Sequence, residues 1–170
     1  IEKNINYYQW LTFLNTIGEK SKRIILHLKF YDPSDWQELF KTKGVDAEIA
    51  EIGSAKDGDK RGIKPGERIF FYDDGENWWS RNGGLATTPV GDPCGPDSEV
   101  FYDFGPDNHA EGFGEAHPAS DSGRFMEIGN QVFMQYRRTD NGFEPLIKQN
   151  VDFGGGLERI SAAAIDSPDV

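Results

Sequence analysis

Apolar residues along the chain follow two different periods, which predict helices and strands. In residues 7–17 they recur at helical spacing, so a first helix is expected there. Residues 22–30 place β-branched and aromatic side chains between charged ends and predict a buried strand. Residues 36–43 predict a second helix, which Asp32-Pro33-Ser34 would open and Gly44 would close.

The remainder of the chain is predicted to be mainly strands and loops. Strands are predicted for residues 67–72, 98–104, 125–137 and 143–151. Thr139-Asp140-Asn141-Gly142 is a hairpin turn of the Asn-Gly kind, so the last two strands should pair as an antiparallel ribbon. A final helix is expected from about Leu157, whereas the polar residues 55–66 and 105–123 predict surface loops. The expected fold class is α+β, an antiparallel sheet flanked by helices.

Length and charge limit the number of domains and the class of partner. The chain has 170 residues, of which 36% are hydrophobic, so we expect one domain over residues 1–170. Within it, residues 1–66 form a lead-in of helix, strand and charged loop, and residues 67–170 carry the sheet. A formal net charge of -11 offers no basic stripe for a nucleic-acid backbone. If the protein handles RNA, regions outside this chain must hold it.

Cysteine usage and hydropathy indicate a cytoplasmic protein. Cys94 is the only cysteine, so the chain can form neither an internal disulfide nor a zinc cage of cysteines. No apolar stretch is long enough to span a bilayer, and the start at Ile1 has no signal-peptide pattern. We therefore expect a cytoplasmic location and no membrane partner. The start at Ile1 rather than methionine suggests a piece of a longer protein.

Residues 151–160 (VDFGGGLERI) combine a strand, a glycine elbow and a helix that carries an arginine. Glycines allow a base or ribose to lie against bare backbone, and the Arg159 guanidinium can stack on a base or reach a phosphate. This layout is typical of a nucleotide site, although a glycine run before a helix is also an ordinary turn.

A site for a small amino acid needs an acceptor for the ammonium group, a donor for the carboxylate and a wall that limits side-chain size. Asp152, Asn130 and Trp79 are candidates for these three roles. Each has an ordinary structural alternative: a cap, a satisfied strand residue and a core residue. The loop residues His109, Glu111, Glu115 and His117 have a spacing that could bind a metal, but solvated side chains are the expected reading and no metal site is predicted.

Four ordered blocks between Asn77 and Ile160 resemble the second half of the alanyl-tRNA synthetase catalytic core. The blocks are residues 77–79 (NWW), 91–103 (GDPCGPDSEVFYD), 126–136 (MEIGNQVFMQY) and 151–160 (VDFGGGLERI). The resemblance implies part of a class II synthetase fold that activates alanine with ATP and Mg²⁺ and charges tRNA(Ala) through regions absent from this chain.

The same resemblance implies roles for individual residues. Residues 151–160 look like the third class II motif, in which Arg159 would stack on adenine and reach toward the γ-phosphate, with Gly156 and Glu99 also at the ATP. Asp152 would bind the alanine ammonium, Asn130 would lie near the alanine carboxylate and Trp79 would line the pocket. Gly154 would leave room for a methyl side chain. The reaction needs no protein nucleophile, because the alanine carboxylate itself attacks the α-phosphate.

The chain also departs from the family pattern. Gly129 replaces the usual tryptophan before Asn130, and the usual Cys-Gly-Pro-Cys is Cys94-Gly95-Pro96-Asp97. Nothing matches the first two class II motifs, so the isolated chain is expected to be inactive and to expose apolar sheet surface that favours self-association. The alternatives are a non-catalytic relative that acts as a nucleotide-binding or interaction module and, from its tryptophans and carboxylates, a carbohydrate-binding β-domain.

Overall fold

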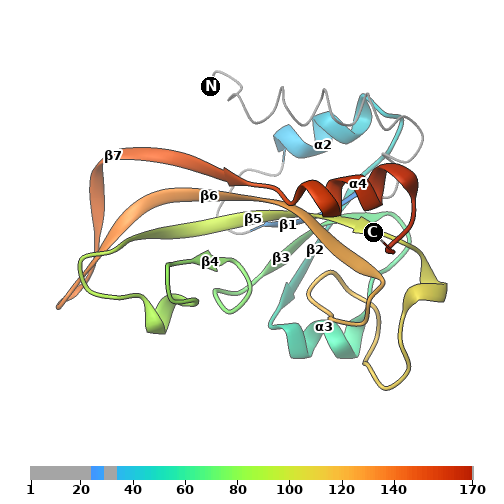
Figure 1. Ribbon diagram of the computed structural model, residues 1–170, viewed down its shortest axis with the longest axis horizontal. Coiled ribbons are helices and arrows are strands. Elements are labelled where there is room, and N and C mark those ends of the chain that lie inside the picture. The colour runs from blue at the N-terminus through green and yellow to red at the C-terminus, as the bar shows by residue number, and fades with distance from the viewer. Residues whose placement is uncertain (1–23, 29–33, 170) are drawn as a thin grey trace.

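The structure is a computed structural model that describes residues 24–28 and 34–169. Within them, a mixed sheet runs in the order β2-β3-β1-β5-β6-β7, and the two-residue strand β4 adds to β5 (Figure 1). The strands are β1 (Ile24–Leu28), β2 (Glu48–Gly53), β3 (Glu67–Tyr72), β4 (Trp78–Trp79), β5 (Pro93–Asp103), β6 (Phe125–Thr139) and β7 (Gly142–Gly154). The helix expected over residues 7–17 lies outside the described residues.

Antiparallel pairing connects the four strands β1, β5, β6 and β7, as the sequence predicts for the sheet. The strands β2 and β3 extend the sheet at the β1 side with parallel pairing. The hairpin between β6 and β7 closes with Thr139 opposite Gly142, so the Asn-Gly turn lies where the sequence places it. The α+β fold class expected from the sequence is confirmed.

Helices cover one face of the sheet, and a helix with a long loop covers the other (Figure 1). The helices α2 (Ser34–Lys41) and α4 (Leu157–Ile165) pack on the first face, where the buried core includes Phe40, Val100 and Ala162. On the second face, α3 (Ala55–Arg61) and the loop around Ala116 cover a smaller core that includes Phe70 and Phe101. Alternate residues of β5 therefore face two different cores.

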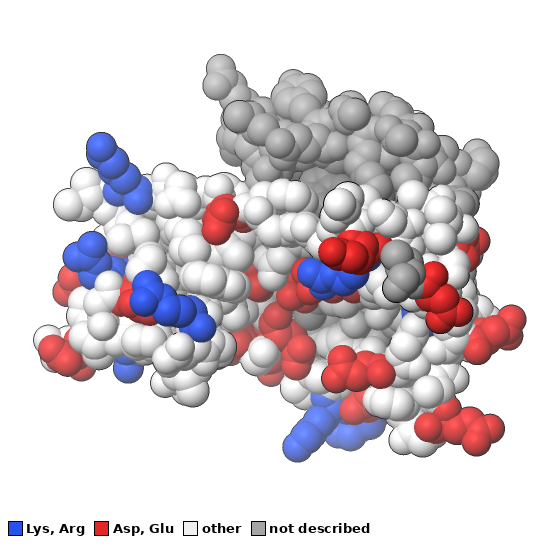
Figure 2. All heavy atoms as spheres, in the orientation of Figure 1, with Lys and Arg blue, Asp and Glu red and all other residues white. Residues whose placement is uncertain are grey.

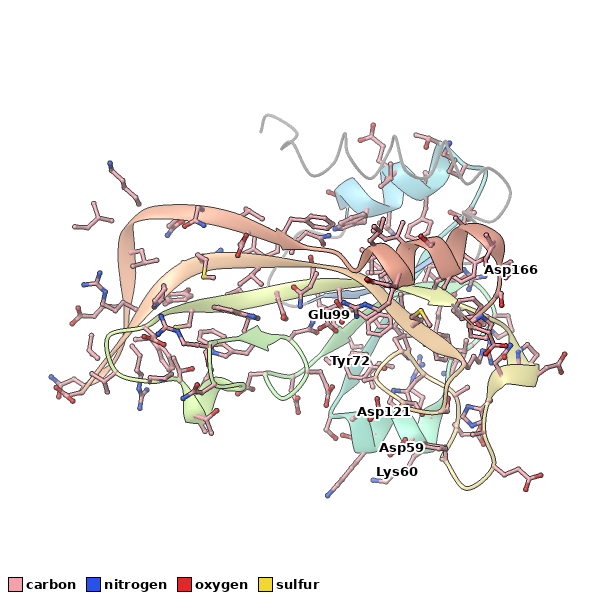
Figure 3. All side chains as sticks on the ribbon, viewed as in Figure 1. Asp59, Lys60, Tyr72, Glu99, Asp121 and Asp166 are labelled. Atoms are coloured by element: carbon pink, nitrogen blue, oxygen red, sulfur yellow. The ribbon has the colours of Figure 1, made fainter. Side chains whose placement is uncertain are left out.

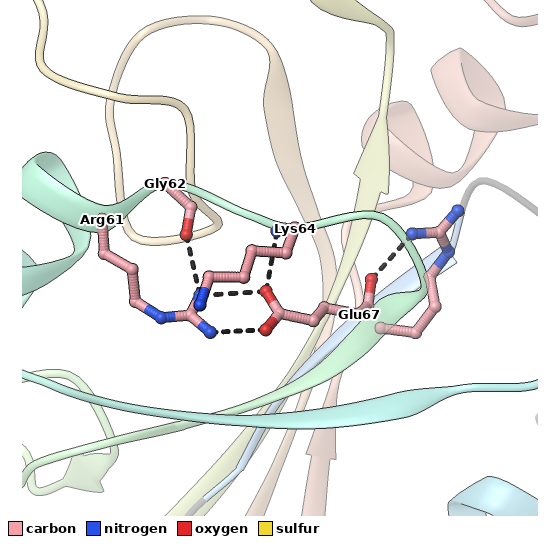
Figure 4. A network of polar contacts seen from close by, with 5 residues as sticks. Arg61, Gly62, Lys64 and Glu67 are labelled. Atoms are coloured by element: carbon pink, nitrogen blue, oxygen red, sulfur yellow. Dashed lines mark hydrogen bonds and ion pairs between the residues drawn. The ribbon is translucent and has the colours of Figure 1, made fainter.

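The helix α3 corrects the sequence analysis, which predicted a surface loop over residues 55–66. Ser54 caps the helix by accepting from the Asp57 backbone, and the Asp57 side chain accepts from Ser54 in return. A partly buried ion pair then joins the end of α3 to β3 (Figure 4). Both guanidinium Nη atoms of Arg61 donate to the Glu67 carboxylate, which also accepts from the Lys64 backbone at 2.8 Å.

Several boundaries also differ from the predicted ones. The strand β2 was not predicted, and β5 begins at Pro93 inside a stretch expected to be irregular. The strand β7 continues past residue 151 through Asp152 to Gly154, so the predicted elbow begins later. The loop over residues 105–123 contains the short 3-10 helix η3 (Pro106–Asn108) and is otherwise irregular, as predicted.

Apolar side chains stay exposed on β7 and α4. Ile147 is 102% exposed, Leu157 75% and Phe153 43%. The strand β7 is also the last strand of the sheet among the described residues. An edge strand with exposed apolar side chains is the kind of surface that other protein segments cover.

Candidate functional site

Three of the expected site residues lie directly opposite one another across β5, β6 and β7. Asn130 on β6 pairs with Glu99 on β5 and with Gly154 on β7. Side chains at directly opposed positions share one face of the sheet, so Glu99, Asn130 and Gly154 form a polar row on the α3 side. The backbone register thus brings together residues that are 55 positions apart at most, from Glu99 to Gly154.

The Asn130 amide is oriented by carboxylates on β5. Its Nδ2 donates to Asp97 Oδ2 at 3.0 Å and to Glu99 Oε1 at 3.2 Å. Because carboxylates accept hydrogen bonds, these two contacts assign the nitrogen and the oxygen of the amide. The Asn130 Oδ1 atom is buried and has no hydrogen-bond partner among the residues that the structure describes. A buried amide oxygen of this kind is an acceptor available to a ligand.

Asp152 lies one step further along the same face. Asp152 on β7 pairs with Val132 on β6, and Val132 pairs with Asp97 on β5. Each of the three is two residues from the member of the polar row on its own strand. Period-two alternation places the Asp152 side chain on the Asn130 face. Asp152 is exposed, and Gly154 leaves open space where a Cβ would stand.

Arg159, in the first turn of α4, lies on the opposite side of the polar row from Asp152 along the strand direction. Its Nη1 donates to Glu127 Oε2 at 2.8 Å, which joins α4 to β6. A Cβ on Gly156 would lie 2.6 Å from Arg159 Nε, so a larger residue there would displace the guanidinium from this position. Glu127 was not among the expected site residues.

A cavity of about 490 Å³ lies on this face, between β5, β6 and the loop that follows η3. Its walls carry four carboxylates and two phenyl rings, together with Ser120. The carboxylates are Glu76, Glu99, Asp121 and Glu127, and the rings are Phe101 and Phe125. We call this the acidic cavity. Figure 2 shows carboxylates gathered near the middle of the molecule, and Figure 3 places Glu99 and Asp121 between β5 and α3.

Glu99 is the group in the acidic cavity whose ionisation is most perturbed. Burial and, to a smaller extent, the charge of Glu127 raise the pKa of the Glu99 carboxyl to about 7. The Arg159 guanidinium and the Asn130 hydrogen bond act in the opposite direction on this pKa. A carboxyl that titrates near neutrality in a cavity is a common mark of a functional site.

Trp79 lies on β4 opposite Gly95, near the Asp97 end of β5 and half-buried. Its neighbour Trp78 turns to the other side of the strand, where it stacks on Tyr136 with ring centroids 6.1 Å apart. Trp78 and Tyr136 line a second cavity of about 610 Å³. Gly95 is four positions from Glu99 along β5, and no described contact joins Trp79 to Asn130 or Asp152.

The loop residues considered as metal ligands fall in different environments. His117 is fully buried, whereas solvated side chains were expected for this loop, so that interpretation was wrong for this residue. His109 Nε2 contacts the Gly114 carbonyl at 2.9 Å. Across the described part of the chain, no group of three or more His, Cys, Asp or Glu side chains is arranged to hold a metal ion. The same described residues contain no helix that is both long and apolar enough to cross a bilayer.

Comparison with known proteins agrees with this arrangement. The family model described as tRNA synthetases class II (A) matches residues 42–167. The match runs from just before β2 to the end of α4 and includes every residue of the polar row. The chain belongs to the class II tRNA synthetase (A) family.

The most similar relatives include three proteins named alanine–tRNA ligase. The protein from Pseudoalteromonas translucida is 46% identical over 101 residues, which cover 58% of this chain and 10% of that protein. The one from Deinococcus radiodurans is 33% identical over an alignment 170 residues long, which covers 91% of this chain and 18% of that protein. The one from Campylobacter jejuni subsp. doylei is 43% identical over 99 residues, or 56% of this chain and 10% of that protein. The chain thus spans less than a fifth of the length of these relatives.

Proposed function

We propose that this chain is part of the catalytic core of an alanine–tRNA ligase, which activates alanine with ATP and transfers it to tRNA(Ala). The observation that carries the proposal is the polar row of Glu99, Asn130 and Gly154, flanked along the strand direction by Arg159 on one side and Asp152 on the other. A site with a guanidinium on one side of this row and an exposed carboxylate on the other suits an aminoacyl adenylate, which is anionic at the phosphate and cationic at the ammonium.

The alanine would occupy the Asp152 end of the row. The exposed Asp152 carboxylate would accept from the ammonium group, and the open space over Gly154 would receive the methyl group. The sequence suggests Asn130 for the alanine carboxylate, but its Nδ2 already donates to Asp97 and Glu99. Its unpartnered Oδ1 is better suited to a second hydrogen bond from the ammonium. Trp79 is proposed as the wall on the β4 side.

The ATP would occupy the Arg159 end, where Gly156 and Glu99 are proposed to contact it. The four carboxylates of the acidic cavity outnumber the one guanidinium beside it, so together these groups would repel a triphosphate. Divalent cations would therefore be needed between the phosphates and the protein. Carboxylate oxygens are suitable Mg²⁺ ligands, and Mg²⁺ commonly takes only one or two of them together with substrate phosphates. The lack of a complete ligand set among the described residues therefore agrees with a Mg²⁺ that arrives with ATP. When bound, the ion would neutralise charge that develops on the phosphates.

The protein's part in the chemistry would be to orient and stabilise. Asp152 and Asn130 would fix the ammonium so that the alanine carboxylate faces the α-phosphate, and Arg159 would hold the nucleotide in line. tRNA(Ala) would bind through other regions of the ligase. A cytoplasmic location and self-association through the exposed apolar residues of β7 are further parts of this proposal.

The test is alanine-dependent exchange of pyrophosphate into ATP by a full-length ligase that contains this chain. We expect activity in that protein and at least a hundredfold loss of kcat/KM for alanine in Asp152→Asn, since about 3 kcal/mol of charge-assisted bonding is removed. Asp140→Asn, in the exposed hairpin turn, is the matched control. No exchange in the parent protein would leave the non-catalytic binding module as the better explanation, and a thermal shift with an alanyl-adenylate analogue would then decide whether nucleotide binding survives.

A further inference from the structure

Asp59, His117 and Tyr72 form a hydrogen-bonded chain that is partly exposed at Asp59 and buried at His117 and Tyr72. His117 Nδ1 lies 2.8 Å from the Tyr72 hydroxyl, and His117 Nε2 lies 3.1 Å from Asp59 Oδ1. The three residues come from different parts of the fold: Asp59 from α3, Tyr72 from the end of β3 and His117 from the loop. The His117 side chain is 0% exposed, and that of Asp59 is 45% exposed. Figure 3 places Tyr72 between the sheet and α3, and Asp59 on α3 itself.

The partners fix the direction of each hydrogen bond. Asp59 is an acceptor, so His117 Nε2 carries the hydrogen that it donates. The Tyr72 hydroxyl is hydrogen-bonded by the backbone of Ala119, and burial raises its pKa, so this hydroxyl stays protonated. It accepts from the Ala119 N–H and donates to His117 Nδ1. The chain thus runs from a surface carboxylate to the backbone of Ala119 and satisfies every group along it.

The residues around this hydrogen-bonded chain are closely packed. A Cβ on Gly58 would lie 2.5 Å from His117 Nδ1, and a Cβ on Gly114 would lie 2.7 Å from the Asp59 Cβ. The backbone on both sides is also tied to α3: Glu115 donates to the Asp59 carbonyl at 2.7 Å, and Ile63 donates to the Ala116 carbonyl at 3.0 Å. The segment that precedes residue 118 is therefore held at several points.

The segment held in this way is a wall of the acidic cavity. Pro118, Ala119, Ser120 and Asp121 all line it, across from Glu99 and Glu127. The Ser120 residue is only 6% exposed, and its Oγ has no hydrogen-bond partner among the described residues. We propose that Tyr72 and His117 are positioning residues, which hold residues 118–121 at the distance from β5 and β6 that nucleotide binding requires. This inference rests on the proposed function.

The residues that line the acidic cavity indicate which substrate's binding depends on residues 118–121. The cavity is lined by Glu99, Phe101, Phe125 and Glu127, and Glu127 is paired with Arg159. Asp152 and Gly154, which are proposed to bind alanine, do not line it. Loosening the wall should therefore weaken the binding of ATP with its divalent cations and leave alanine binding nearly unchanged.

The test is pyrophosphate exchange by the full-length ligase with Tyr72→Phe, which keeps the ring and removes both hydrogen bonds of the hydroxyl. We expect the KM for ATP to rise about tenfold while the KM for alanine changes less than about twofold, because a small displacement of a positioning group is costly. His117→Gln keeps an amide that can donate to Asp59 but removes the acceptor of the Tyr72 hydroxyl. It should therefore also raise the KM for ATP much more than the KM for alanine. In the double variant the two effects should not add, since both break one chain.

Glu111→Gln is the matched control, because Glu111 is an exposed acid of the same loop. Asp59→Asn, at the partly exposed end, provides a milder variant if His117→Gln fails to fold. A lower melting temperature with equal changes in both KM values, or with none, would overturn the positioning role while the proposed function stands. If the parent protein shows no alanine-dependent exchange, the proposed function is wrong, and this inference, which rests on it, is wrong as well.

Discussion

Arg159 donates a hydrogen bond to Glu127 at 2.8 Å and so joins α4 to β6 just beyond the point where β7 leaves the sheet. The last paired position of β7 is Gly154, opposite Asn130, so the segment of β6 that carries Glu127 has no β7 neighbour. This gap lets a side chain from the helix on one face reach the acidic cavity on the other. The contact is partly exposed, with 42% and 28% exposure for the two side chains, so it contributes little to stability. Its effect is on the orientation of the guanidinium.

Glu127→Gln should therefore impair catalysis more than folding. The amide keeps an oxygen acceptor but loses the charge that holds Arg159, so we expect kcat/KM for ATP to fall about tenfold. The free energy of unfolding of the 170-residue chain should change by less than about 1 kcal/mol. Glu144→Gln, an exposed acid near the hairpin end of β7, is the control. Equal kinetics in the two variants would argue against a role for the ion pair.

Glu99 gives the chain a stability that falls as pH rises. Burial, with the charge of Glu127, raises its pKa from 4.5 to about 7, so between these values the folded state holds a proton that the unfolded state releases. The contribution is present below pH 4.5 and is lost as pH rises through 7. Glu99→Gln should remove this slope and raise stability at pH 8 by on the order of 3 kcal/mol. Urea unfolding at pH 5 and pH 8 measures it, with Glu111→Gln as control; parallel pH curves for Glu99→Gln and the parent chain would contradict it.

Elements with a clear local pattern could be predicted from the sequence. The strand β3 has the predicted bounds, and the β6–β7 hairpin follows from alternation and an Asn-Gly turn. The helix α3 could not be found in the same way, because its sequence AKDGDKR has no apolar period. Its buried residue is Gly58, whose importance depends on His117, a contact that is distant in sequence.

The site shows the same division between local and non-local information. Asp152 to Arg159 form a continuous motif, and their elements were predicted to within a few residues. Glu127 was not found, because strict alternation from Asn130 would place it on the opposite face. An irregularity in the β5–β6 pairing moves it, since Val100 pairs with Gly129 but Phe101 pairs with Glu127. The skipped Ile128 enters the core with α4, and Glu127 turns to the cavity.

The Arg61–Glu67 pair should be important for stability. Glu67 is 5% exposed, and the hydrogen bonds from Arg61 hold the pKa of its carboxyl below the usual range. Arg61→Ala would leave a buried carboxylate without its cation, so we expect a loss of about 3 kcal/mol at pH 7. Because the Glu67 pKa is lowered, the pair's contribution is present above pH 4.5 and is lost as the pH falls further. Lys60→Ala, whose side chain is 78% exposed, should change stability by less than about 0.5 kcal/mol. Similar losses in the two variants would contradict this.

Gly154→Ala tests the proposed methyl pocket without disturbing the fold. A Cβ at Gly154 would meet nothing within 4 Å, so the chain should tolerate alanine with a stability change below about 1 kcal/mol. In the full-length ligase, the added methyl would fill the space proposed for the substrate side chain. We expect the KM for alanine to rise at least tenfold, since overfilling a pocket by one carbon costs about 1–3 kcal/mol. The activity with glycine relative to alanine should increase for the same reason.

Gly84→Ala is a close control for this experiment, because a Cβ there also meets nothing within 4 Å and the residue lies in the loop before η2 (Leu85–Thr87), away from the polar row. It should change neither stability nor the KM for alanine. The two variants differ only in where the methyl group is added, so a rise in KM confined to Gly154→Ala locates the alanine side chain over Gly154. An unchanged KM in Gly154→Ala would show that the side chain lies elsewhere, and the assignment of the alanine end of the row would then be wrong.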